Sequence, residues 1–196
     1  MSKLTLADIV EPRAYERERD DFRAHVVALK KKRRVGIGPH VTLVFENRDT
    51  IRFQIQEMAR VEKIFTDEGI QTELDIYNAL LPGNGRLSAT LFIELTSDAE
   101  LREWLPKLVG IERSIELRFG DHVVASVPES AHDEQLTREE ITAAVHYIEF
   151  QLDADQVDAL GSAESAELAV VHPAYQHVTA LGPETRAELA DDARSA

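Results

Sequence analysis

The sequence of 196 residues contains 22 basic and 36 acidic side chains, 43% hydrophobic residues and no cysteine. A chain of this length can bury roughly 70% of its unfolded surface in one core, so it needs no disulfide or structural metal to fold. Without cysteine, it cannot form disulfides, thiolate zinc sites or cysteine-ligated iron–sulfur clusters, and it has no cysteine nucleophile. No stretch is apolar enough for a signal peptide or a membrane span, so we expect a cytoplasmic protein with no membrane partner.

Charge is distributed unevenly along the chain. Residues 1–63 hold 14 basic and 10 acidic groups, a net charge of +4, whereas residues 64–196 hold 8 and 26, a net charge of −18. Affinity for phosphate depends on summed positive charge, so the acidic part argues against nucleic acid as a partner. The basic run at residues 30–34 is typical of a helix C-terminus, where cations complement the helix dipole.

Two helices are predicted at the N-terminus. Thr5 precedes an apolar pattern and is followed three residues later by Asp8, which is typical of a capping box. From Pro12 a long amphipathic helix is predicted to run to about Arg34, because apolar side chains recur at helical spacing at Tyr15, Phe22, Val26 and Leu29. Residues 1–38 therefore form an N-terminal helical segment. Such a helix suits a homodimer contact as well as a core position, and both alternatives stay open.

Residues 40–57 alternate apolar and polar side chains in two runs, which predicts a β-hairpin. A three-residue loop at 47–49 places Phe45 opposite Ile51 and keeps the apolar side chains of both strands on one face. Asp49 tolerates the left-handed conformation that the third position of such a loop requires. Loop length and side-chain alternation thus predict the same register.

The opposite face of this predicted hairpin collects hydrogen-bonding side chains. They are His40, Thr42, Glu46, Arg52, Gln54 and Gln56, with Arg48 in the loop and Glu57 directly after the second strand. One interpretation is a solvated face, since antiparallel sheets often expose one side to water. The other is a binding face, because planar amide and guanidinium groups suit recognition of a carboxylate, an amide or a partner backbone.

Helices and strands alternate irregularly through the rest of the chain. Helices are predicted from the change of period after Gln56 and from the N-caps Thr66, Ser97 and Asp153. Strands are predicted at residues 87–94, 114–119, 122–127, 143–152 and 168–171, and 114–127 is a second hairpin. A loop is expected at 128–135, a helical turn at 138–141, and a polar helix that frays into a tail at 184–196. We therefore predict a single α+β domain over residues 1–196, in which a mainly antiparallel sheet built from hairpins packs against several helices.

Histidines mark two further features. His146 lies on the apolar face of strand 143–152, where a hydrogen-bonded core residue is the commoner outcome than a ligand. Pro173 predicts a tight turn in the HPAY sequence, with His172 and Tyr175 near its mouth. His172 and His177 are five residues apart and no third ligand is evident, so we expect no metal and no cofactor.

Several segments together resemble a known family. They are residues 29–58 (LKKKRRVGIGPHVTLVFENRDTIRFQIQEM), 120–122 (GDH), 143–150 (AAVHYIEF) and 170–175 (VVHPAY). The chain is similar over nearly its whole length to the bacterial domain-of-unknown-function family 3501. The resemblance implies a genomic context, because relatives are typically encoded beside rubrerythrin-like proteins and iron–sulfur oxidoreductases of the heterodisulfide-reductase type. It offers no catalytic residues, but His146, His172 and Tyr175 fall in the matching motifs and join the candidate site.

Two functions are compatible with the sequence. The first is an accessory or adaptor protein that docks a rubrerythrin-type or iron–sulfur partner through the polar hairpin face and the basic end of the first long helix. A cysteine-free chain beside redox enzymes suits a scaffold better than an electron carrier. The second is an enzyme or small-ligand protein with a pocket on the hairpin, in which arginine holds an anion and a glutamate or histidine moves a proton. The residues of this pocket would be His40, Glu46, Arg52, Gln54, Gln56 and Glu57.

Overall fold

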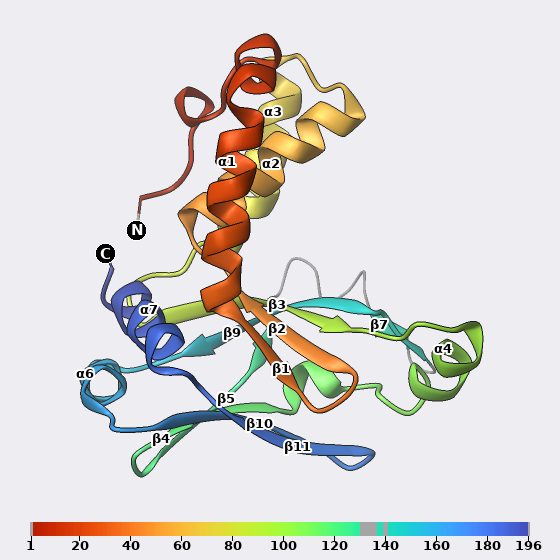
Figure 1. The fold of residues 1–196 in the computed structure, drawn as a ribbon, viewed down its shortest axis with the longest axis vertical. Coiled ribbons are helices and arrows are strands. Elements are labelled where there is room, and N and C mark those ends of the chain that lie inside the picture. Colours follow the sequence, from red (N-terminus) through yellow and green to blue (C-terminus); the bar gives the residue numbers. More distant parts are fainter. Residues whose placement is uncertain (1, 130–136, 139–140, 196) are drawn as a thin grey trace.

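Two antiparallel sheets face each other in the lower part of the molecule, and three helices project from one of them (Figure 1). The computed structural model describes residues 2–129, 137–138 and 141–195. In the first sheet the strand order is β1-β2-β3-β9-β6, and in the second it is β11-β10-β4-β5. The predicted α+β single domain is confirmed.

All strand pairs in both sheets are antiparallel. The first sheet contains β1 (Arg34–Ile37), β2 (Val41–Phe45), β3 (Arg86–Ile93), β9 (Val145–Gln151) and β6 (Val127–Pro128). The second contains β11 (Tyr175–Ala180), β10 (Ala166–His172), β4 (Ile115–Phe119) and β5 (His122–Ala125). A separate short pair joins β7 (Thr137–Arg138) to β8 (Ile141–Thr142).

The main core lies between the two sheets. Leu43, Leu91 and Ile148 point into it from the first sheet, and Leu117 and Leu168 point into it from the second; all five are 0% exposed. Helices α4 (Asp98–Trp104), α6 (Ala154–Ser162) and α7 (Pro183–Arg194) border this core at the ends of the sheets (Figure 1). Helix α7 contributes three buried apolar side chains to this core, Leu189, Ala190 and Ala193.

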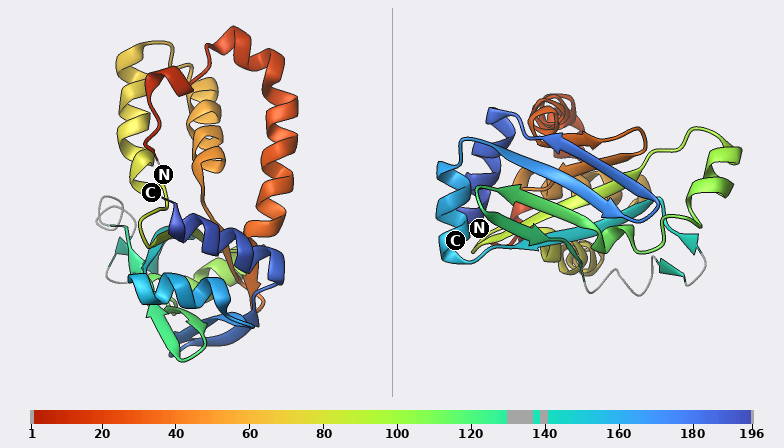
Figure 2. Two further views of the ribbon diagram at one scale, coloured as in Figure 1. Left: turned by 90° about the vertical axis from the view of Figure 1, so that its left-hand side faces the viewer. Right: turned by 90° about the horizontal axis from the view of Figure 1, so that it is seen from below.

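A second core holds the projecting helices together. These are α1 (Pro12–Arg33), α2 (Arg48–Glu62) and α3 (Asp67–Tyr77), followed by the short 3-10 helix η2 (Asn78–Leu80). Figure 2 shows them standing side by side above the sheets. Their core contains Ile51 and Ile55 of α2, Leu74 and Tyr77 of α3, and Leu4 from the N-terminal segment.

The predicted hairpin at 40–57 is wrong beyond Phe45. Asn47 begins helix α2 with a capping box, in which its side chain accepts a hydrogen bond from the Thr50 amide at 3.0 Å and its amide donates to Thr50 Oγ1 at 2.8 Å. Ile51 and Ile55 are spaced by four, which fits the core face of a helix as well as one face of a strand. The spacing of the apolar residues is therefore compatible with both structures, and the capping box at Asn47 favours the helix.

Strand β2 instead pairs with β1 and β3. Helix α1 ends at Arg33, and the next residues, expected to be the helix end and its stop, form the edge strand β1. Thr42 on the polar face of β2 and Glu46 directly after the strand are buried rather than solvated. Because layers cover both faces of β2, every residue of this strand is buried.

Most of the other predicted elements are observed. The N-caps Thr66, Ser97 and Asp153 each accept a hydrogen bond from a backbone amide of their helix. Strands β4 and β5 form the second hairpin, and β10 and β11 are joined by the HPAY turn. The helical turn expected at 138–141 is wrong, because Arg138 pairs with Ile141 in a two-residue ladder. The loop expected at 128–135 falls mostly on residues 130–136, which lie outside the described residues. Among the described helices, none is both long and apolar enough to cross a bilayer.

Candidate functional site

Three of the predicted polar residues of segment 48–56 lie on one face of helix α2. Arg48, Arg52 and Gln56 are spaced by four, so they project side by side along the helix. This face contacts residues 4–10 of the same chain, which we call the N-terminal strap. The strap contains the 3-10 helix η1 (Leu6–Asp8) and leads into α1.

Each of these three side chains binds the strap. Arg48 Nη2 donates to Asp8 Oδ1 at 2.6 Å, and Arg52 Nε donates to the Asp8 carbonyl oxygen at 2.8 Å. Gln56 makes two hydrogen bonds to the backbone of Val10: Nε2 donates to the carbonyl at 2.8 Å, and Oε1 accepts from the amide at 2.9 Å. The hydrogen bond from Arg48, followed by that from the Thr5 amide, lowers the pKa of Asp8 to about 2. This face therefore binds one carboxylate and the backbone groups of Asp8 and Val10, all from its own chain.

Asn78 binds the other end of the strap in the same way. Its Oδ1 accepts from the Leu4 amide at 2.8 Å and its Nδ2 donates to the Leu4 carbonyl at 2.9 Å. The Leu4 side chain is 3% exposed and packs in the helical core. Sequence reasoning missed Asn78, since no local pattern connects it with a residue 74 positions earlier.

Glu57 connects α2 to α1 rather than to the strap. It accepts from Tyr15 Oη at 2.6 Å and from the Arg19 guanidinium at 2.8 and 2.9 Å. The hydrogen bond from Arg19 holds the pKa of Glu57 below its usual value, and burial together with Glu57 raises the pKa of Tyr15. Polar contacts of this kind continue along the helix pair, including Arg60–Glu16 at 2.6 Å.

The strap also forms one wall of a pocket at the free end of the helical layer, which we call the apical pocket. Its volume is about 760 Å³. Apolar residues lining it are Leu6, Ile9, Val10, Pro12, Ala59, Ile64, Phe65 and Ile70. Charged side chains of both signs, such as Arg13 and Asp67, also line it. Its volume falls within the range of about 300–1,000 Å³ that is usual for ligand pockets.

Glu46 and Gln54 lie apart from these residues, in a smaller pocket of about 200 Å³ between the helices and the first sheet. The Glu46 side chain is buried and accepts from Thr90 Oγ1 at 2.6 Å. Tyr147 lines the same pocket, and burial, followed by the neighbouring Tyr77 and Glu46, raises its pKa to about 12. The structure thus brings Glu46 and Gln54 together but separates them from Arg48, Arg52 and Gln56.

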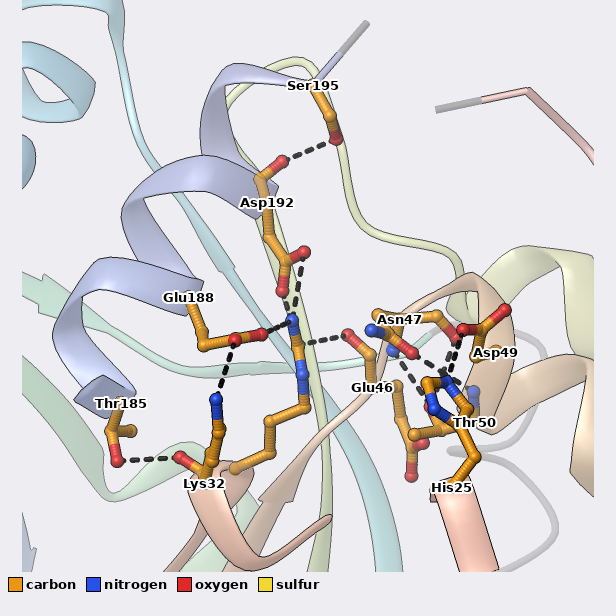
Figure 3. A network of polar contacts seen from close by, with 11 residues as sticks. His25, Lys32, Glu46, Asn47, Asp49, Thr50, Thr185, Glu188, Asp192 and Ser195 are labelled. Atoms are coloured by element: carbon orange, nitrogen blue, oxygen red, sulfur yellow. Dashed lines mark hydrogen bonds and ion pairs between the residues drawn. The ribbon is translucent and has the colours of Figure 1, made fainter. Parts of the chain in front are cut away.

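The basic end of α1 is partly occupied by helix α7. The buried Arg33 guanidinium binds Asp192 and Glu188, and it donates a long 3.5 Å hydrogen bond to the Glu46 carbonyl. Figure 3 shows Glu188 and Asp192 on α7 facing this end of α1, with Glu46 on the other side. Burial opposes the charge of Arg33, but the two carboxylates outweigh it and raise its pKa. Arg33 is therefore an internal cation that attaches α7 to α1.

His40 and Tyr175 connect the two sheets. Tyr175 Oη donates to the Ile37 carbonyl at 2.7 Å and accepts from the His40 amide at 2.9 Å. The His40 ring lies 4.8 Å from the ring of Trp104, and the Tyr175 ring lies 4.5 Å from that of His177, measured between centroids. The family motifs around residues 38–40 and 172–177 therefore meet at one end of the sheets and hold them together.

The remaining two histidines are buried and hydrogen-bonded. His172 Nε2 lies 3.1 Å from the Val109 carbonyl and its Nδ1 accepts from the Ala174 amide at 3.2 Å, which requires the tautomer protonated at Nε2. His146 Nε2 lies 2.8 Å from Thr142 Oγ1 and 2.9 Å from the Ala143 carbonyl. Across the described part of the chain, no three histidine or carboxylate side chains gather closely enough to hold a metal ion.

Comparison with known proteins places this fold in a family. The family profile described as "Protein of unknown function (DUF3501)" matches residues 3–193. A crystal structure of a novel protein of unknown function from Burkholderia pseudomallei K96243 is 39% identical, with a TM-score of 0.89, over 97% of this chain and 99% of that chain. No curated protein matches the sequence. The chain belongs to the DUF3501 family of proteins of unknown function.

Proposed function

We propose that the chain is an accessory protein that binds another protein at the apical pocket. The carrying observation is the apolar pocket of about 760 Å³ at the free end of α1–α3, flanked by side chains that water reaches. Phe65, which lines this pocket, is 68% exposed although it is a large apolar residue. Exposed apolar groups around a concave surface with a charged rim are typical of a binding site for a protein or an apolar ligand.

The partner we propose is a redox protein of the rubrerythrin or iron–sulfur oxidoreductase type. The genomic context that the family resemblance implies supports this choice, and so does the lack of cysteine, which leaves metal chemistry to the partner. The polar face of α2, formed by Arg48, Arg52 and Gln56, is engaged with the strap, and Arg33 of the basic run at residues 30–34 is buried. These internal contacts leave the apical pocket open.

Binding of purified candidate partners tests this proposal. A rubrerythrin-like protein and a heterodisulfide-reductase-type oxidoreductase encoded beside the gene are passed over the immobilised full-length chain in biolayer interferometry. We expect one of them to bind, and Phe65→Asp to weaken binding at least about tenfold, since burying a phenylalanine is worth about 1.5–3 kcal/mol. Val178→Asp, at an exposed valine on strand β11, is the matched control and leaves binding unchanged. The proposal fails if neither protein binds or if both variants behave alike.

A second candidate function is binding of a small cationic molecule beside Glu46. Its carboxylate is buried, accepts a hydrogen bond from Thr90 Oγ1, and lines the pocket of about 200 Å³ together with Tyr147 and Lys30. A small amine bound in this pocket would donate hydrogen bonds to the carboxylate and offset its negative charge. Ethylamine should shift the NMR signals of Thr90 and Tyr147 saturably in the wild type and not in Glu46→Gln; equal shifts in both proteins would exclude this site.

A further inference from the structure

We infer that the face of α2 and η2 under the strap is a peptide-binding groove, that the strap is its intramolecular ligand, and that a partner segment of the same conformation, with a helical turn at its centre, displaces it. The segment would share the chemistry of the strap: a leucine-like residue, an aspartate four positions later, and two aliphatic residues directly after it. This inference rests on the proposed function only in taking the partner to be a protein.

Backbone recognition is the first argument. Gln56 and Asn78 each engage both the amide and the carbonyl of one strap residue, at distances of 2.8–2.9 Å. Such paired contacts satisfy both backbone groups of a bound residue whatever its side chain, so they recognise the main chain on either side of the turn at Leu6–Asp8. The two carboxamides come from different helical elements and hold residues six positions apart, so they define a track rather than a single contact.

Side-chain recognition is the second argument. Leu4 is buried among Ile51, Leu74 and Tyr77, so the groove has an apolar socket at one end. Arg48 lies 2.6 Å from the Asp8 carboxylate, a charge-assisted contact that requires an acidic residue at this position of the occupant. Socket and cation together select the spacing of leucine and aspartate.

The strap is attached in a way that permits exchange. It pairs with none of the described strands, and among its residues 4–10 only Leu4 is fully buried. It joins the body at Pro12, the first residue of α1, so release of the strap does not require α1 to unfold. Segments with few buried contacts open at low cost, and release of this one would also remove a wall of the apical pocket.

Fluorescence anisotropy on the full-length protein tests the inference. The probe is a labelled peptide of residues 2–11, SKLTLADIVE. The wild type should bind it weakly, because the tethered strap competes at an effective concentration on the order of millimolar. Weakening the strap alone, with Leu4→Ser and Asp8→Ala, should raise peptide affinity at least about tenfold by removing this competition. Lys3→Ala, at an exposed residue directly before the strap, is the matched control and should change nothing.

Groove variants complete the test. Adding Gln56→Ala to the strap-weakened protein should abolish the gain, and a probe carrying lysine in place of Asp8 should not bind. Circular dichroism verifies that each variant is folded. The inference is overturned if the folded strap-weakened protein binds the peptide no better than the wild type, or if both peptides bind equally. Peptide binding without binding of either redox protein would leave the groove standing and reject the proposed partner.

Discussion

Replacing Gln56 with alanine removes the central contact between α2 and the strap. Gln56 is 3% exposed, and both of its hydrogen bonds go to the backbone of Val10. Leaving a buried donor or acceptor unpaired costs about 1–3 kcal/mol per group. Val10 is half-buried, so water reaches its released groups and the lower part of that range applies to each. We expect a loss of about 2 kcal/mol in the free energy of unfolding, or about 4–8 °C in Tm for a chain of this size.

Gln54→Ala is the matched control for this prediction. Gln54 lies on the same helix and is half-buried, but it makes no hydrogen bond among the described residues. Its replacement should change stability by no more than about 0.5 kcal/mol. Urea denaturation followed by circular dichroism measures both values. Equal stability of the two variants would refute the view that Gln56 anchors the strap.

Three further predictions concern other parts of the fold. Asp192→Asn should lower the free energy of unfolding by about 3 kcal/mol, because it removes one of the two carboxylates that pair with the buried Arg33 guanidinium. Asp191→Asn, at a side chain that is 82% exposed, should have little effect, and similar denaturation curves for the two variants would contradict this prediction. Gly38→Ala should lower the free energy of unfolding by about 2 kcal/mol, since φ is +71° and a Cβ would lie 2.5 Å from neighbouring side-chain atoms. The Cβ of Gly36→Ala would meet open space, so that variant should keep its stability, and equal melting temperatures of the two variants would contradict this prediction. Because the pKa of Asp8 is lowered by folding, the ionised carboxylate stabilises the folded state above the usual pKa of 3.8, and this stabilisation is lost as the pH falls toward 2. We expect the loss to be about 1 kcal/mol after allowance for solvent screening. An Asp8 carboxyl that titrates near 3.8 by NMR would contradict this prediction.

Local signals in the sequence predicted most of the secondary structure. The N-caps Thr66, Ser97 and Asp153 stand where helices begin, and the apolar face of β9 is buried as the alternation indicated. Each of these signals depends on residues only a few positions apart. The prediction for segment 46–57 is wrong because two local signals compete there. The spacing of Ile51 and Ile55 suits both a strand and a helix, and the Asn47–Thr50 capping box coincides with the predicted hairpin loop at 47–49.

The contacts of the candidate site depend on residues far apart in the chain. Asn78 binds a residue 74 positions away, and Arg33 binds one 159 positions away. A periodic pattern of residues cannot predict contacts over such separations in the chain. The sequence did indicate the chemistry of the α2 face, since arginine and glutamine side chains there bind a carboxylate and backbone amide and carbonyl groups. It could not indicate that both come from the N-terminus of the same chain, because this requires the tertiary arrangement of α2 and the strap.

Hydrogen exchange on the full-length protein tests most directly whether the strap is a displaceable ligand. The amides of Leu4 and Val10 donate to Asn78 and Gln56, so they should exchange slowly in the protein alone. A saturating amount of unlabelled strap peptide should speed exchange at these two amides while the core amides of β3 and β9 keep their rates. Unchanged exchange at Leu4 and Val10 under saturating peptide would contradict the account, because the strap would then be a fixed part of the fold.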